Sequence, residues 1–355
     1  MRRTKGGRRD FLLAPLQLPG CGRMGIRERE VLHMTSWLRI GVLVAVTVGF
    51  SAVQALAYEV VTRRNIQYAE HDGVKLQGDL YHPRTRERER LPVVPVIIAV
   101  HGGGWQSGSP SFYRHWGPFL AAAGYAVFAI EYRLSKPGEK SYPAAVYDVR
   151  AAVQYVRTQA GSLAIDPERI VLMGDDAGAQ LAALVALANA EPQFSNQYKS
   201  DPYAGAPATV RAAAVFYGMY GLRAQWEHDQ LARPLDQVTE RFLGAPPMAD
   251  ARLYFEASPM SYATVDRNKP SFLVIYGTSD EVVDASAQSL AFLAALRQAK
   301  FFARKIEIPS VGHYWVPDPF DEPESPNVYV GVRLLRFLER ALHNAPAGGE
   351  QGPPS

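Results

Sequence analysis

Three short stretches of the chain carry side chains that could perform nucleophilic or acid–base chemistry. The first is Gly174-Asp175-Asp176-Ala177-Gly178, which follows one apolar run and precedes another with helical spacing. Glycines at this spacing permit a sharp strand-to-helix turn that exposes the residue at its tip, where a nucleophile can stand. The tip residue is Asp176, so the candidate nucleophile is a carboxylate. Adjacent side chains at a turn point apart, and we therefore expect Asp175 to be structural.

The second stretch is a glycine-rich turn, His101-Gly102-Gly103-Gly104-Trp105, directly after an uninterrupted apolar run. Glycines let successive backbone N–H groups turn inward, and such donors stabilise a developing oxyanion by several kcal/mol. Ala177 follows the candidate nucleophile and offers one more N–H group. The candidate oxyanion donors are therefore Gly102, Gly103, Gly104 and Ala177.

The third constellation supplies an acid and a base. Asp280 closes the turn Gly277-Thr278-Ser279-Asp280 after an apolar run, and His313 follows the next predicted strand. An aspartate beside a histidine holds the imidazole in the tautomer that can accept a proton. The chain order Asp176, Asp280, His313 is that of nucleophile, acid and base.

These residues follow apolar runs that predict a parallel sheet. Strands covered on both faces read as continuous apolar runs, and such runs occupy residues 93–100, 125–130, 170–173, 212–217 and 272–276. Apolar residues at helical spacing separate them, at residues 145–156, 285–296 and 328–342. This alternation predicts one α/β domain with a mostly parallel twisted sheet and helices on both faces.

Other segments complete this predicted domain. Residues 65–70 and 74–81 flank Asp72-Gly73 and predict a hairpin. Residues 302–308 alternate apolar with charged side chains, which favours a strand at the edge of the sheet. Prolines and aromatic residues interrupt every pattern between about 218 and 270, and we interpret this segment as a small cap-like insertion near the mouth of the site.

The first 57 residues predict a leader that lies outside the fold. Residues 34–57 contain an arginine, an apolar stretch and Ala55-Leu56-Ala57, the three parts of a secretory signal peptide, and residues 1–33 form an upstream extension. The sequence therefore predicts an exported protein, periplasmic or secreted, with an uncleaved membrane anchor as the alternative. The α/β domain would then span residues 58–344, followed by a disordered tail at 345–355.

Composition and motifs exclude several functions. A net charge of +3 over 355 residues, with 47% hydrophobic residues, is ordinary for a globular protein and indicates no nucleic-acid partner. The one cysteine, Cys21, precedes the predicted cleavage point, which excludes disulfides and thiol chemistry in the mature chain. Consecutive residues rarely converge on one ion, so Trp226-Glu227-His228-Asp229 predicts a solvated surface. We expect no metal and no cofactor.

The stretches HGGGW, GDDAGAQLAA, ASPMSYA, YGTSDEVV and VGHYW together resemble the α/β-hydrolases of the hormone-sensitive-lipase-like and bacterial feruloyl-esterase-like branch. The likeness covers residues 65–342 and implies an α/β-hydrolase fold with carboxylesterase activity on a small or carbohydrate-linked ester. It implies Asp280 as acid, His313 as base, and Gly102, Gly103 and Ala177 as oxyanion donors. That branch carries a serine at the elbow, and this chain departs from it at Asp176.

The aspartate leaves three functions open. The first is an enzyme of esterase descent with residual or unusual hydrolase activity. The second is a hydrolase that forms an alkyl ester on Asp176, as epoxide hydrolases do. The third is a silent binding protein in which Asp176 pairs with His313 and fills the site. Such a pair should raise the pKa of His313, and a protonated imidazole cannot act as a base.

Overall fold

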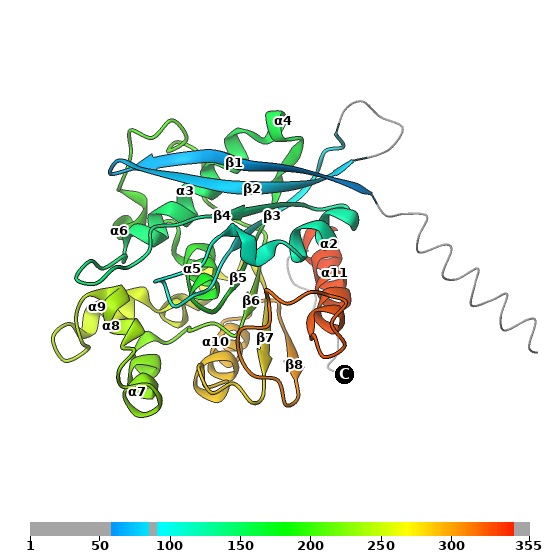
Figure 1. The fold of residues 1–355 in the computed structure, drawn as a ribbon. Coiled ribbons are helices and arrows are strands. Elements are labelled where there is room, and N and C mark those ends of the chain that lie inside the picture. The colour runs from blue at the N-terminus through cyan, green and yellow to red at the C-terminus, as the bar shows by residue number, and fades with distance from the viewer. Residues whose placement is uncertain (1–57, 85–90, 344–355) are drawn as a thin grey trace, which may run out of the picture. The chain divides into compact units, whose positions relative to one another are not determined.

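The computed structural model describes residues 58–84 and 91–343, in which eight strands form one mostly parallel sheet (Figure 1). The strands lie in the order β1-β2-β4-β3-β5-β6-β7-β8. The pairs β1–β2 and β2–β4 are antiparallel, and all the others are parallel. The predicted α/β fold is confirmed, with β8 at one edge. The strands are β1 (Glu59–His71), β2 (Val74–Arg84), β3 (Val94–Val100), β4 (Ala126–Ile130), β5 (Ile165–Asp175), β6 (Ala212–Phe216), β7 (Ser271–Gly277) and β8 (Ala303–Ile308).

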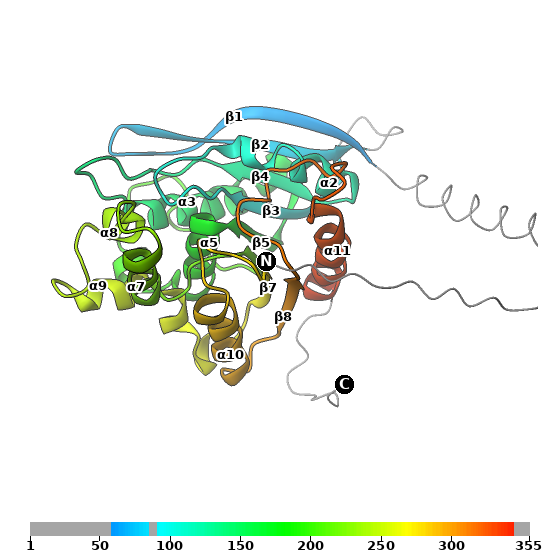
Figure 2. The same cartoon turned by 60° about the horizontal axis from the view of Figure 1, so that its bottom comes forward.

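Side chains of β3 alternate between two cores, one on each face of the sheet. Val96, Ile98 and Val100 pack with α3, α5 and α10, whereas Ile97 and Ala99 pack with α2 and α11 (Figures 1 and 2). Because both faces are covered, every residue of β3 is buried, and this explains its continuous apolar run. The covering helices are α2 (Trp116–Ala122), α3 (Ala144–Thr158), α5 (Asp176–Ala188), α10 (Ala291–Gln298) and α11 (Asn327–His343). Shorter segments are η1 (Pro110–Tyr113), α4 (Ala160–Leu163), α6 (Pro192–Ser195) and the π-helical turn η4 (Ser286–Leu290).

A buried cluster of charges ties the β1–β2 hairpin to α3. Asp72 and Gly73 form its turn with φ angles of 51° and 77°, the positive values that a tight hairpin turn requires. Beside the turn, His71 Nδ1 and Arg133 Nη2 each lie 2.7 Å from Asp148 Oδ1. Asp148 is fully buried and has both of these side chains as partners, which fixes the hairpin turn against α3.

The segment expected to form a cap-like insertion contains short helices between β6 and β7. They are α7 (Leu222–Ala232), α8 (Val238–Leu243), α9 (Ala251–Ala257), η2 (Pro259–Tyr262) and η3 (Val265–Arg267). Figure 1 shows α7, α8 and α9 grouped together. We refer to residues 218–270 as the insertion.

The predicted leader at 1–57 and the predicted tail at 345–355 lie outside the described residues. Among the residues that are described, no helix has the length and apolar character needed to cross a membrane.

Candidate active site

The strand-to-helix turn lies where β5 ends at Asp175 and α5 begins at Asp176. Asp176 has a φ of 50°, the strained left-handed conformation expected at the tip of such a turn. A Cβ atom at Gly174 would lie 2.3 Å from the carbonyl oxygen of Gly178, and one at Gly178 would lie 2.0 Å from that of Val100. Only glycine fits these two positions, which places the side chain of Asp176 at the end of the parallel strands.

The carboxylate of Asp176 fills two positions that a hydrolase would use in catalysis. Its Oδ2 accepts hydrogen bonds of 2.8 Å from the backbone N–H groups of both Gly103 and Gly104. A further interaction with the N–H group of Ala177 helps to stabilise the ionised form. Oδ1 lies 3.4 Å from Nε2 of His313. One oxygen therefore faces the predicted oxyanion donors, and the other faces the predicted base.

The glycine-rich turn differs from the prediction at Gly102. Its N–H group donates to Oδ1 of Asp175 at 3.1 Å and not to the oxyanion position. The hydroxyl of Tyr113 donates to the same oxygen at 2.8 Å. The prediction that Gly102 is an oxyanion donor was therefore wrong, because the buried Asp175 beneath the turn takes its N–H group. Asp175 has the structural position that we expected for it.

Asp280 and His313, the predicted acid and base, lie in contact. Nδ1 of His313 lies 2.7 Å from Oδ2 of Asp280. The other oxygen of Asp280 accepts hydrogen bonds of 2.9 Å from the N–H groups of Val282 and Val283, which fix the carboxylate. Nε2 of His313 is buried and has no aligned hydrogen-bond acceptor in the described part of the chain, so its contact with Asp176 is an ion pair.

Electrostatics favour a charged pair at this centre. Burial by itself lowers the pKa of His313, but the carboxylates of Asp176 and Asp280 outweigh it and raise the pKa to about 9. Burial by itself raises the pKa of Asp176. The neighbouring His313 and the backbone N–H groups outweigh burial, so the pKa of Asp176 is lowered. The centre is thus an imidazolium between two carboxylates, a state in which the histidine carries its proton and cannot act as a base.

The insertion lies against both sides of this centre, as expected from the sequence for a segment near the mouth of the site, although the contacts themselves were not predicted. In α8, the ring of Phe242 stacks on Trp105 of the glycine-rich turn with ring centres 4.2 Å apart. In α7, Gln225 donates to the backbone carbonyl of Val282 at 2.9 Å, beside the acid Asp280. The packing of α7 and α8 therefore connects the loop of the predicted oxyanion donors to the loop of the acid.

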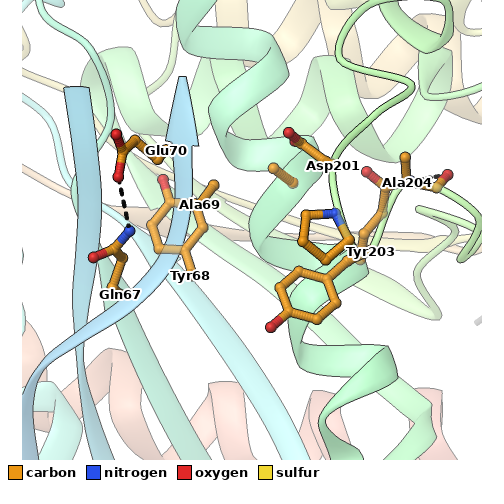
Figure 3. Close-up of a pocket in the computed structure, with 10 residues that line it drawn as sticks. Gln67, Tyr68, Ala69, Glu70, Asp201, Tyr203 and Ala204 are labelled. Carbon is orange, nitrogen blue, oxygen red and sulfur yellow. Dashed lines mark hydrogen bonds between the residues drawn. The ribbon is translucent and has the colours of Figure 1, made fainter. Parts of the chain in front are cut away.

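Two cavities lie away from the centre. One, of about 270 Å³, lies between β1 and residues 201–204 (Figure 3). Another, of about 540 Å³, adjoins the hairpin turn and includes His101 and Tyr132. Neither is lined by Asp176 or His313. No cluster of three or more side chains that could hold a metal ion occurs among the described residues.

Comparisons with known proteins show the family of this chain. The family model BD-FAE matches residues 79–296, more than half of the chain. Esterase LipQ of Mycobacterium tuberculosis is 35% identical over 210 residues, which are 58% of this chain and 46% of LipQ. The probable carboxylic ester hydrolase LipM of the same organism is 29% identical over 295 residues, which are 80% of this chain and 64% of LipM. The chain thus spans about half to two thirds of the length of these relatives.

Solved structures show the same fold. The propionate-bound esterase Est2 of Thermogutta terrifontis has a TM-score of 0.62 at 22% identity, over 82% of this chain and 97% of that structure. The predicted resemblance to carboxylesterase-type α/β-hydrolases is confirmed by the family match and by these relatives. The chain belongs to the BD-FAE family and has the α/β-hydrolase fold.

Proposed function

We propose that this protein is a carboxylic-ester hydrolase for small esters in which Asp176 restrains turnover. The observation that carries the proposal is the position of its carboxylate. Oδ2 receives 2.8 Å hydrogen bonds from Gly103 and Gly104, and Oδ1 lies 3.4 Å from Nε2 of His313. In an ester hydrolase these are the positions of the oxyanion and of the nucleophilic oxygen, so the side chain occupies both.

The chemistry of a carboxylate explains why turnover should be slow. Attack of Asp176 on an ester carbonyl would form a mixed anhydride and expel an alkoxide, which is uphill. General-base catalysis by His313 is also weak, because a histidine with a pKa of about 9 is neutral in roughly 3% of molecules at pH 7.5. The remaining parts, a buried acid–base pair and inward-facing N–H groups, fit ester hydrolysis.

Replacement of the carboxylate tests the proposal. Asp176→Ser frees the oxyanion donors, supplies a hydroxyl and removes one of the charges that hold His313 protonated. Because a single oxyanion donor contributes about 10²–10³ to kcat, we expect Asp176→Ser to hydrolyse 4-nitrophenyl butyrate at least about 10² times faster than the parent.

Two controls make this result specific. Asp176→Ala opens the same space without a nucleophile and should stay near the parent rate. Asp176→Ser combined with His313→Ala should lose the gain. A serine variant that folds like the parent and shows no gain would contradict the proposed function.

The substrate class proposed here is a small or carbohydrate-linked ester. It is supported by the motif resemblance and by the family match. The serine variant allows a direct comparison of 4-nitrophenyl acetate, a feruloyl ester and an acetylated xylo-oligosaccharide. A clear preference for the sugar-linked esters would support a carbohydrate-linked substrate. Activity on 4-nitrophenyl acetate alone would contradict a carbohydrate-linked substrate and leave a small ester.

A second candidate function uses the aspartate itself as nucleophile toward an sp3 carbon. It is favoured by one observation, that Oδ2 is held by two N–H groups while Oδ1 faces His313. In this reaction Oδ1 would displace a leaving group and form an alkyl ester of Asp176. Water, deprotonated by His313, would then add at Cγ, release the alcohol and restore the carboxylate with one oxygen from water.

Isotope labelling separates this candidate from the first. A single turnover of an epoxide in heavy-oxygen water should place label in the peptide that contains Asp176. Product formed without label in that peptide would exclude the alkyl-enzyme route. Hydrolysis of esters by the serine variant, together with no epoxide turnover by the parent, would favour the first function.

We also propose that the protein is exported, on the basis of the signal-peptide pattern at residues 34–57. Expression with a C-terminal tag, followed by cell fractionation and N-terminal sequencing, tests this. Cleavage should leave Tyr58 as the first residue. A full-length chain in the cytoplasmic fraction would contradict export, and a full-length chain in the membrane fraction would support the uncleaved anchor.

A further inference from the structure

Arg233, at the C-terminal end of α7, has a guanidinium held by a buried anchor. Its Nη2 donates to Oδ1 of Asp229 at 2.7 Å. Asp229 is fully buried, so the predicted solvated surface at residues 226–229 was wrong at this position. It also accepts 2.9 Å hydrogen bonds from Gln225 in α7 and Thr239 in α8. The carboxylate therefore joins the two helices of the insertion that pack on either side of the centre, and it fixes the arginine between them.

Tyr314 lies between the arginine and the predicted base in the chain of contacts. The ring of Tyr314, the residue after His313, lies edge-on to the imidazole with ring centres 4.3 Å apart. Burial raises the pKa of Tyr314, and the neighbouring guanidinium of Arg233 acts in the opposite direction. The charge of Arg233 also interacts with the carboxylate of Asp176. Arg233 thus lies next to Tyr314, one residue beyond the predicted base, with only a fifth of its side chain exposed.

The guanidinium is bonded to Asp229 and to the Tyr314 hydroxyl, which leaves part of its hydrogen-bonding capacity unused. Nε is buried and has no acceptor in the described part of the chain. The nearest acidic oxygen to Nη1 is that of Asp236, 3.9 Å away, which is too long for a hydrogen bond. A planar guanidinium with spare donors matches the geometry of a carboxylate.

We propose that Arg233 binds a carboxylate carried by the substrate, so that the preferred esters are half-esters of dicarboxylic acids. This inference rests on the proposed function, since it concerns the substrate of the same centre. The charges at the centre explain why an anionic ester would need such a partner. His313 is flanked by two carboxylates, and an anionic ester would be repelled there unless a cation outside that pair received its charge.

Two esters that differ only in charge test the proposal. One is the 4-nitrophenyl monoester of adipic acid, whose free end is a carboxylate, and the other carries a carboxamide at that end. The adipate chain is too long for its carboxylate to attack the ester readily. With the full chain carrying Asp176→Ser, we expect kcat/KM for the acid to exceed that for the amide by roughly tenfold, as a charge-assisted pair supplies.

Variants of the arginine show whether it is the source of the preference. Arg233→Gln should remove the acid-over-amide ratio, and Arg233→Lys should keep part of it because the positive charge remains. Arg223→Gln is the matched control, since Arg223 lies on the same helix and pairs with Glu227 at the solvent surface. It should leave the ratio unchanged.

A binding measurement separates this inference from the proposed function. Calorimetry with the full chain carrying Asp176→Ala should show roughly tenfold tighter binding of the acid than of the amide, and Arg233→Gln should abolish the difference. If Asp176→Ser hydrolyses neither ester, the proposed function fails, and calorimetry still decides the role of Arg233. Equal binding of the two esters, or an Arg233→Gln variant that weakens both alike, would overturn the inference and leave Arg233 a support of the insertion.

Discussion

Asp176→Asn should uncouple the charged pair at the centre while it keeps the shape of the side chain. The amide oxygen can still accept from Gly103 and Gly104, and the amide nitrogen can donate to a neutral His313. The carboxylate of Asp176 lies 3.4 Å from Nε2 of His313. Together with the carboxylate of Asp280 it raises the pKa of His313 from 6.5 to about 9, although burial lowers that pKa. An opposite charge at this distance raises a histidine pKa by about 1–3, so we expect the variant to lower it by about 1–2.

The same change should alter how stability depends on pH. The pKa of His313 is higher in the folded chain than in the unfolded chain, so its contribution is complete below pH 6.5 and is lost as the pH rises through about 9. The size of that contribution is roughly 3 kcal/mol. Between pH 7.5 and 9.5 the free energy of unfolding of the parent should fall by about 2 kcal/mol from this group, and that of Asp176→Asn by clearly less.

Two measurements check this reasoning. Nuclear magnetic resonance of histidine ring protons against pH, with His313→Gln to assign the signal, reports the pKa directly. Urea unfolding at pH 7.5 and 9.5 reports the stability. Buried Asp175, whose pKa burial raises to about 7, has lost most of its proton at these pH values in both states and adds little to the slope. A His313 pKa that stays near 9 in Asp176→Asn would refute the ion pair.

Three further changes test other parts of the structure. Asp175→Asn should raise the free energy of unfolding at pH 8 by about 2–4 kcal/mol and leave it unchanged at pH 4. The reason is that burial raises the pKa of the Asp175 carboxyl to about 7, so its ionised form destabilises the fold. Urea unfolding at both pH values measures this difference. Gly178→Ala should prevent folding or cost more than about 4 kcal/mol, since its Cβ would lie 2.0 Å from a backbone oxygen, whereas Gly161→Ala, with open space, should fold normally by circular dichroism. Asp148→Asn should cost about 2–4 kcal/mol in urea unfolding because His71 and Arg133 then lose their shared, fully buried anion and keep only Asp201 and Asp72 as partners. Asp72→Asn, whose side chain is 67% exposed, should cost under about 1 kcal/mol.

The sequence alone determined the sheet and the order of the chemical groups. Continuous apolar runs predicted strands covered on both faces, and β3 to β7 are such strands. The glycines at 174 and 178 predicted a turn that admits no side chain at either position. Asp280 and His313 were placed at consecutive strand ends, and parallel strands bring such ends to one edge. These features are local in the chain, so a pattern of residue types is enough to show them.

Contacts between distant segments were decided only by the tertiary structure. Within the glycine-rich turn, Gly103 and Gly104 face Asp176 and Gly102 faces Asp175, a choice made by a carboxylate 73 residues further along the chain. Arg233 lies in a segment without a recognisable pattern, and its place beside Tyr314 depends on the packing of α7 and α8. Hydrogen-bond direction and charge pairing depend on distances of a few ångströms between such segments, and no spacing along the chain encodes those distances.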